Sequence, residues 1–227
     1  FLIVGNVDLD TLKPLVEKYL GSLPTSKKVE YAVVDDGVRF VDGNVVNDFR
    51  TAMQQPKVSV RLVYSGDMEN NAKNRMIVEL LSRALDSRYM ISIREEKGGT
   101  YGVSVQGGIE KYPTEEYMMA IVFDTNEQLA DELIEICDKE IKKIAEEGPL
   151  ADDVAKSKEF LQKNYNNVLE NNGGWMSAIT RWYEEGYNYK EEYLPLVNSI
   201  TYDDVKVMAQ KILADGNYIK VMMRPEK

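Results

Sequence analysis

The sequence predicts an α+β fold in which a mostly antiparallel sheet packs against several helices. Stretches with alternating apolar and polar residues, typical of half-buried strands, are interspersed with stretches whose apolar residues recur at helical spacing. Two of the strand-like stretches, about 100–109 and 117–124, are joined by a short turn near Pro113. Such short connections favour antiparallel neighbours and a layer of helices against the sheet.

Length and charge exclude several classes of protein. The 227 residues suffice for one large or two small domains, and the formal net charge is −10. Nucleic acid is not an expected partner, because binding phosphates needs clustered Lys and Arg, which here are scattered among acids. No apolar run approaches the roughly 20 residues that a membrane-spanning helix needs.

The first 28 residues predict a strand, a helix and a linker. Residues 1–6 are apolar enough for a buried strand, and Asp8 can cap a helix over residues 9–20. Residues 21–28 combine Gly, Ser, Pro and Thr with two lysines, which predicts a helix stop followed by a linker.

The middle of the chain predicts strands and helices in alternation. Residues 29–40 and 57–64 have the composition of strands, and apolar residues recur at helical spacing from Met76 to Leu85. Asp86 and Ser87 are expected to cap a second helix that ends at Gly98-Gly99.

The remaining elements follow from periodicity and caps. Thr201 and Asp204 form a capping box at the start of a helix that runs to about Leu213. Before it come a pair of strands and four further helices, and a last strand follows it: strands at about 100–109, 117–124 and 217–223, and helices at about 127–147, 151–170, 174–185 and 191–199.

The composition removes most catalytic chemistry. The chain contains no histidine, so it cannot form a Ser-His-Asp triad, a Cys-His pair or an imidazole zinc site. The single cysteine, Cys137, lies on the apolar stripe of a predicted helix, which indicates a buried structural thiol. Trp175 and Trp182, seven residues apart, are expected to pack in the core rather than to bind a ligand. Acid pairs such as Glu95-Glu96 are expected to be solvated surface.

Arg94 and Tyr101 are the candidate site residues. A helix end, a two-glycine turn and a strand start can bring these two side chains onto one rim. A guanidinium and a protonated phenol could both donate hydrogen bonds to a peptide carbonyl, as donors do to a developing oxyanion in acyl transfer. The competing interpretation is structural: a cation suits a helix C-terminus, and Tyr101 shares a strand face with Val103 and Val105.

At these residues the chain resembles the C-terminal half of the insulinase (pitrilysin-like) family of zinc peptidases. The resemblance covers nearly the whole chain and rests on segments that occur in the family's order and spacing: FLIVGNVDLD (1–10), YLGSLP (19–24), IREEKGGTYGVSV (93–105), EYMMAIVF (116–123) and SITYDDVKVMAQKIL (199–213).

The resemblance implies a role within a larger enzyme. Such peptidases enclose a chamber between two halves; the N-terminal half binds zinc through an inverted His-x-x-Glu-His motif, and the C-terminal half offers an arginine and a tyrosine to the substrate peptide. Arg94 and Tyr101 match the latter pair, whereas this chain lacks the zinc motif, so zinc is expected in a partner N-terminal half, in the same chain or a separate subunit. Residues 1–25 would end a preceding homologous domain and residues 30–227 would form the last one. The resemblance also favours a bacterial periplasmic or cell-envelope location.

Two alternatives remain open. The chain could belong to a catalytically inactive homologue that serves as a scaffold, because a fold can lose its metal site and keep its shape. It could also be a peptide-binding module that adds a strand to the edge of its sheet.

Overall fold

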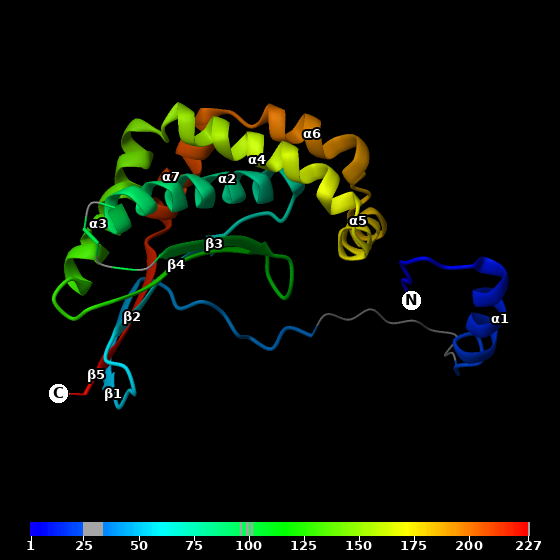
Figure 1. Cartoon of the computed structure of the whole chain (residues 1–227), viewed down its shortest axis with the longest axis horizontal. Helices are drawn as coiled ribbons and strands as arrows, with labels where there is room; N and C mark the ends of the chain where they lie inside the picture. Colours follow the sequence, from blue (N-terminus) through cyan, green and yellow to red (C-terminus); the bar gives the residue numbers. More distant parts are fainter. Residues whose placement is uncertain (25–33, 96, 99, 101, 227) are drawn as a thin grey trace.

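A computed structural model of the chain describes residues 1–24, 34–95, 97–98, 100 and 102–226. Within these residues it contains seven α-helices, one π-helical turn and a five-stranded sheet, which confirms the predicted α+β class (Figure 1). In chain order the elements are α1 (Leu9–Tyr19), β1 (Asn44–Thr51), β2 (Val58–Asp67), α2 (Ala72–Tyr89), η1 (Met90–Glu95, the π-helical turn), β3 (Val103–Glu110), β4 (Glu116–Thr125), α3 (Ala130–Glu147), α4 (Ala151–Leu169), α5 (Asn172–Glu185), α6 (Tyr189–Ser199), α7 (Tyr202–Asp215) and β5 (Asn217–Pro225).

The sheet is mostly antiparallel, as predicted. Its strand order is β1-β5-β2-β4-β3, and the pairs β2–β4, β2–β5 and β3–β4 are antiparallel. The exception is β1, which pairs in parallel with β5, the last strand of the chain. The register sets Val58 opposite Thr125 and Val103 opposite Phe123, so β2 begins and β4 ends at the same end of the sheet.

Helices α2 to α7 lie on one side of the sheet (Figure 1). Helix α2 contacts β3 and supplies much of the core, with Leu80, Leu81 and Leu85 fully buried. Burying a leucine side chain is worth about 1.5–3 kcal/mol, so this helix is a main source of the domain's stability. Arg61 and Gln106, on the other face of the sheet, are exposed.

Several local predictions are confirmed. The Asp8 carboxylate accepts a hydrogen bond from the Thr11 backbone N–H at the start of α1. Thr201 and Asp204 form both hydrogen bonds of the capping box at the start of α7. Cys137 is a free, buried cysteine on α3.

Two strand predictions are wrong. Residues 1–6 belong to no strand of the described sheet, and Phe1 is 97% exposed. Of the strand predicted at residues 29–40, residues 29–33 lie outside the described residues, and residues 34–40 form no strand. The first strand is Asn44–Thr51 instead, because its partner is β5, about 170 residues away, and no local pattern reveals that pairing.

Two further predictions are wrong for tertiary reasons. The helix is not re-capped at Asp86 and Ser87; α2 continues through them, and the Asp86 carboxylate accepts a hydrogen bond from the Val105 N–H of β3. Trp175 and Trp182 are not core residues, since they are 41% and 51% exposed on α5, which has no buried residue.

Helix α1 lies apart from the sheet and its covering helices (Figure 1). It contains no buried residue, and Leu9 and Tyr19 are 75% and 61% exposed. The first 24 residues therefore contribute little to the core around the sheet.

Adjacent glycines in the first turn of α5 give a test of the α4–α5 packing. A Cβ at Gly174 would overlap the backbone carbonyl of Val168 on α4, whereas one at Gly173 would lie 3.3 Å from the Asn171 side chain, which can shift. We expect Gly174→Ala to lower the free energy of unfolding by about 1–3 kcal/mol through overpacking. Gly173→Ala, the matched control, should change it by less than about 1 kcal/mol, since alanine favours the helix. Urea denaturation of both variants makes the comparison, and equal losses would contradict this packing.

Asp153, in the first turn of α4, gives a test of pH-dependent stability. It is 7% exposed, and Oδ2 has no hydrogen-bond partner among the described residues. Burial raises the pKa of this carboxyl, against the opposing charges of Arg88 and Lys156. The folded state therefore holds the proton more tightly, so stability falls as pH rises through the interval between the unfolded and the raised folded pKa.

We therefore expect Asp153→Asn to be more stable than the wild type at pH 7, by about 1 kcal/mol. This advantage should disappear at about pH 3, below the ordinary Asp pKa of about 3.9, because the carboxyl is then mostly protonated in both the folded and the unfolded wild type. Asp152→Asn is the control, because Asp152 is exposed and pairs with Lys156. Thermal unfolding at both pH values measures the difference, and a pH-independent effect would show that the ionised carboxylate is not the cause.

Candidate functional site

Arg94 is positioned by the π-helical turn η1, which continues α2. Within this turn Ile93 is fully buried, and the Ser92 hydroxyl donates a hydrogen bond to the Arg88 carbonyl at 3.0 Å. These contacts fix the turn against the core and leave Arg94 on the exposed side. Single π-helical turns are rare and are frequent at functional sites.

The guanidinium of Arg94 keeps most of its donors unused within the described structure. Nη1 donates to the Met90 sulfur at 3.3 Å, a weak acceptor, and no carboxylate of the described residues forms an ion pair with it. The Arg94 carbonyl accepts a hydrogen bond from the Gly98 N–H at 3.1 Å, and Gly98 has a φ of 61°, which favours glycine. The side chain can therefore donate hydrogen bonds to a ligand.

Tyr101 lies outside the described residues, so its pairing with Arg94 stays a prediction. On either side of it, the Thr100 hydroxyl bonds to both the carbonyl and the N–H of Gly102. Lys97 forms an ion pair with Glu132 on α3, 2.6 Å between Nζ and Oε1. The described parts of this loop are thus attached to both the strand start and α3.

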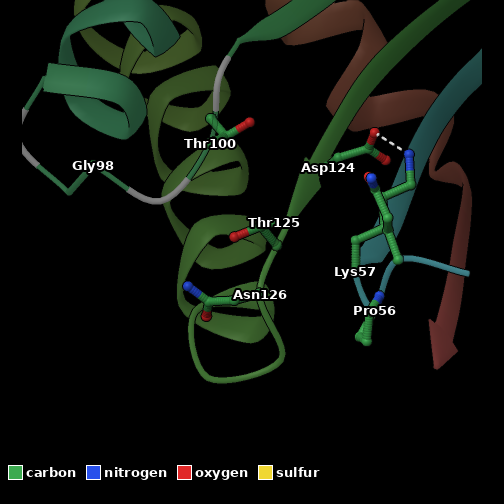
Figure 2. A pocket seen from close by; sticks show the side chains of 8 residues that line it. Pro56, Lys57, Gly98, Thr100, Asp124, Thr125 and Asn126 are labelled. Atoms are coloured by element: carbon green, nitrogen blue, oxygen red, sulfur yellow. Dashed lines mark hydrogen bonds and ion pairs between the residues drawn. The ribbon is translucent and has the colours of Figure 1, made fainter. Parts of the chain in front are cut away.

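A cleft of about 580 Å³ lies beside this loop. Figure 2 shows its three walls: Gly98 and Thr100 of the loop on one side, the start of β2 on another, and the end of β4 with the residues after it. The lining residues are Gln55, Pro56, Lys57, Gly98, Thr100, Asp124, Thr125 and Asn126. The loop that follows Arg94 therefore lines a concave surface at the end of the sheet.

Asp124 supplies the carboxylate of this cleft, and both of its oxygens already accept hydrogen bonds from neighbouring side chains. Its Oδ2 pairs with the Lys57 ammonium at 2.7 Å, and its Oδ1 accepts from the Ser59 hydroxyl at 2.6 Å (Figure 2 draws the ion pair). Burial acts to raise the pKa of Asp124, but the hydrogen bonds from Lys57 and Ser59 outweigh it and lower that pKa. The carboxylate stays ionised and bonded at neutral pH, which suits a structural role better than that of a general base.

The edge strand β3 is partly closed to strand addition. The Val105 N–H donates to Asp86 Oδ1 at 3.1 Å, and the Ile109 carbonyl accepts from the Asn70 side chain at 2.9 Å. A Cβ at Gly107 would overlap the Ser82 hydroxyl of α2, so the helix packs directly on the strand. A peptide that paired with β3 would have to displace these side-chain bonds.

The described residues do not fit a zinc site. They contain no cluster of three or more His, Cys, Asp and Glu side chains placed to hold a metal ion. The thiol of Cys137 is buried, and burial raises its pKa, which disfavours the thiolate that zinc binds.

Sequence reasoning found Arg94 but not the cleft beside it. Lys57, Thr100 and Asp124 come from three separated segments and share no motif, so only the sheet register brings them together. The polar residue Asp124 at the end of the apolar strand β4 was the available signal, and it is ambiguous because strand ends are commonly polar.

Comparisons with known proteins agree on the fold. The family model described as the peptidase M16 inactive domain matches residues 1–161. A protein of Arabidopsis thaliana named as a PQQL-like zinc protease is 24% identical over 195 residues, which are 81% of this chain and 20% of that protein. The chain thus spans about a fifth of the length of this relative.

Two of the solved structures with the same fold come from bacteria. The periplasmic protease PqqL of Escherichia coli superposes with a TM-score of 0.77 at 20% identity, covering 98% of this chain and 25% of that one. A peptidase M16 inactive domain from Pseudomonas fluorescens gives a TM-score of 0.76 at 17% identity, over 99% of this chain and 53% of that one. Neither identity supports more than the shared fold.

The chain has no histidine, and its described residues have no cluster of metal-binding side chains. We therefore expect the chain alone to bind no zinc at micromolar concentrations and to hydrolyse no peptide. Titration with zinc against a chromophoric chelator measures binding, and a quenched fluorescent peptide measures hydrolysis. Cys137→Ser is the control for adventitious binding to the thiol. Stoichiometric zinc binding that persists in this variant would contradict the prediction, as would peptide cleavage by the pure chain.

Proposed function

Because this chain belongs to the family of peptidase M16 inactive domains, we propose that it is the substrate-contacting, non-metal-binding C-terminal domain of a zinc-dependent endopeptidase that hydrolyses peptides in an enclosed chamber. In this proposal Arg94 and Tyr101 hydrogen-bond the substrate peptide. A partner N-terminal half, in the same chain or a separate subunit, holds the zinc.

This chain covers only a small share of its relatives, which supports the proposal that it contacts the substrate while another part of the protein binds zinc. The chain corresponds to 20% of the Arabidopsis zinc protease and 25% of Escherichia coli PqqL, so most of each relative lies outside the matched part. A chain without histidine needs another source of metal ligands if it is to take part in zinc-dependent hydrolysis.

The observation that carries the substrate-binding role is the exposed guanidinium of Arg94. Ile93 anchors the turn in the core, so the position of Arg94 is fixed before a ligand arrives. A preorganised donor stabilises developing charge without reorganising at the moment of reaction. The adjoining cleft provides concave space in which a peptide segment could lie.

The chemistry of the two side chains fits a peptide carbonyl. A guanidinium is charged at every physiological pH and presents planar donors, and a phenol remains a donor below about pH 10. Both would bind the carbonyl oxygen more strongly as negative charge develops on it. When bound in the partner half, zinc would activate the attacking water.

We extend the proposal to domain organisation and location. Residues 1–25, which contain α1, are the end of a preceding homologous domain, and residues 30–227 are the C-terminal domain. The separation of α1 from the sheet supports this division (Figure 1). The periplasmic location named for Escherichia coli PqqL supports a bacterial periplasm or cell envelope for the parent protein. No helix of the described residues is long and apolar enough to cross a bilayer.

The alternative hypothesis, an inactive scaffold homologue, differs from the proposed peptidase in the sequence of the partner half. An inactive homologue would retain this fold but lack the His-x-x-Glu-His motif in the partner half. The sequence of that half therefore separates the two hypotheses. Peptide binding by strand addition is less favoured at β3, where Asp86 and Asn70 already bond the strand.

In the intact enzyme we expect Arg94→Ala and Tyr101→Phe each to lower kcat by about 10²–10³, the effect of removing one oxyanion donor. KM should change less, because the bonds strengthen in the transition state. Steady-state kinetics on a fluorogenic peptide measures both constants.

Two matched variants control for folding and charge. Arg61→Ala removes another exposed arginine, and Tyr112→Phe removes the hydroxyl of a tyrosine that is 60% exposed. Both should retain wild-type kinetics. Unchanged kcat in folded Arg94→Ala enzyme would remove Arg94 from the mechanism.

A further inference from the structure

Two adjoining cavities lie between helices at the opposite end of α2 from Arg94. One, of about 220 Å³, is lined by α2, α4, α6, Arg181 of α5 and the residues that follow α5. The other, of about 360 Å³, lies between α4, α5 and α6. Both are lined by Arg181 and Tyr193, so they adjoin at these two side chains, and the pair is named here the α5–α6 cleft. Figure 1 shows these helices grouped at one end of the helical layer.

Two of the three arginines of the α5–α6 cleft are held by other side chains. Arg75 pairs with Glu185 at 2.5 Å between Nη2 and Oε2. Arg83 pairs with Glu79 at 2.7 Å, and its guanidinium carbon lies 4.1 Å from the centre of the Phe160 ring. The charges of both guanidinium groups are thus already balanced by carboxylates.

Arg181 is different. No hydrogen bond or ion pair joins its guanidinium to another residue of the described chain. Burial raises the pKa of Tyr187 and of Tyr189 to about 12, while the charge of Arg181 acts to lower both. Arg181 lines one cavity with Tyr187 and the other with Tyr189. Their phenols cannot neutralise the guanidinium, because they stay protonated at neutral pH.

Tyr189 and Tyr193, which line a cavity together with Arg181, belong to a cluster of three tyrosine rings that forms one wall of the cleft. The Tyr189 and Tyr193 ring centres lie 4.6 Å apart, and Tyr165 stacks on both at 5.5 and 5.9 Å. The Tyr165 hydroxyl donates to the Lys190 carbonyl at 2.7 Å, and Tyr189 is only 8% exposed. The wall is therefore rigid before a ligand arrives, which lowers the entropic cost of binding.

We propose that the α5–α6 cleft binds a carboxylate carried by a peptide, with the guanidinium of Arg181 as the anion partner and the rings of Tyr189 and Tyr193 against the adjoining peptide. Guanidinium and carboxylate groups match in a planar, two-bond geometry, and the charge assistance makes these bonds strong. The tyrosine rings offer apolar surface with little conformational entropy to lose.

The charge of the surroundings selects this ligand class. The chain has a net charge of −10, which repels polyanions such as nucleic acid. A single unbalanced guanidinium suits one monovalent anion, and a carboxylate is the one that peptides carry. Either a C-terminal carboxylate or an Asp or Glu side chain supplies that group.

This site goes beyond the proposed function, because it binds without cleaving. Helix α2 has 18 residues and is roughly 27 Å long, and the cleft adjoins its first turns whereas Arg94 follows its last. The two sites can therefore be tested separately. Loss of peptide hydrolysis in an Arg94 variant would leave the α5–α6 cleft intact.

The test uses the 227-residue chain and three N-acetylated pentapeptides of alanine and leucine. One has a free C-terminal carboxylate, one is amidated, and one is amidated with a central glutamate. Isothermal titration calorimetry measures binding, and the fluorescence of the chain's two tryptophans, Trp175 and Trp182, both on α5, reports whether it occurs at this helix. We expect at least one peptide with a carboxylate to bind about tenfold or more tightly than the amidated, glutamate-free peptide. The preferred one of the two identifies the source of the carboxylate.

Variants assign the effect to Arg181. Arg181→Gln should remove the difference between the peptides, and Arg181→Lys should restore part of it, since it keeps the charge but loses the planar fork. Arg61→Gln, at an exposed arginine on the sheet, should have no effect. Equal affinity for all three peptides would overturn the proposal. So would an unchanged preference in folded Arg181→Gln protein.

Discussion

The burial of α2 against the sheet is the contact on which the rest of this structure depends. Leu80, Leu81 and Leu85 are fully buried, and the helix ends in Tyr89, whose hydroxyl donates to the Cys137 carbonyl of α3 at 3.1 Å. This bond and the apolar contacts fix the position of α2 over the sheet and its rotation about its own axis. The π-helical turn that follows inherits that placement, and Ile93 extends the same buried face.

The same helix organises two surfaces of different character. At its C-terminal end, the loop after η1 borders a cleft whose carboxylate, Asp124, is paired with Lys57. At its N-terminal end, Arg75 and Arg83 are neutralised by carboxylates while Arg181 is not. The difference between a structural and a binding role lies in these partners rather than in the residue types, since arginines and acids occur at both ends.

The sequence was most informative where local chemistry decides structure. The Asp8 cap and the Thr201–Asp204 box appear as predicted because each bond spans three residues. The strand predictions at residues 1–6 and 34–40 are wrong because apolar composition marks a segment that can form a strand, and a strand also needs a partner. The prediction that the two tryptophans of α5 pack in the core is wrong for a related reason. A seven-residue spacing puts two side chains on one face of a helix, but it does not say whether another element packs against that face.

The sequence by itself determined the α+β class, most helix bounds, the absence of imidazole chemistry and Arg94 as a candidate. These features follow from composition and from interactions within a few residues. Only the tertiary structure decided that β1 pairs in parallel with β5, that Asp86 bonds an edge strand instead of capping a helix, and that Arg181 has no partner among the described residues. The reason is that pairing, burial and charge balance depend on groups that are distant in sequence, and folding alone brings those groups together.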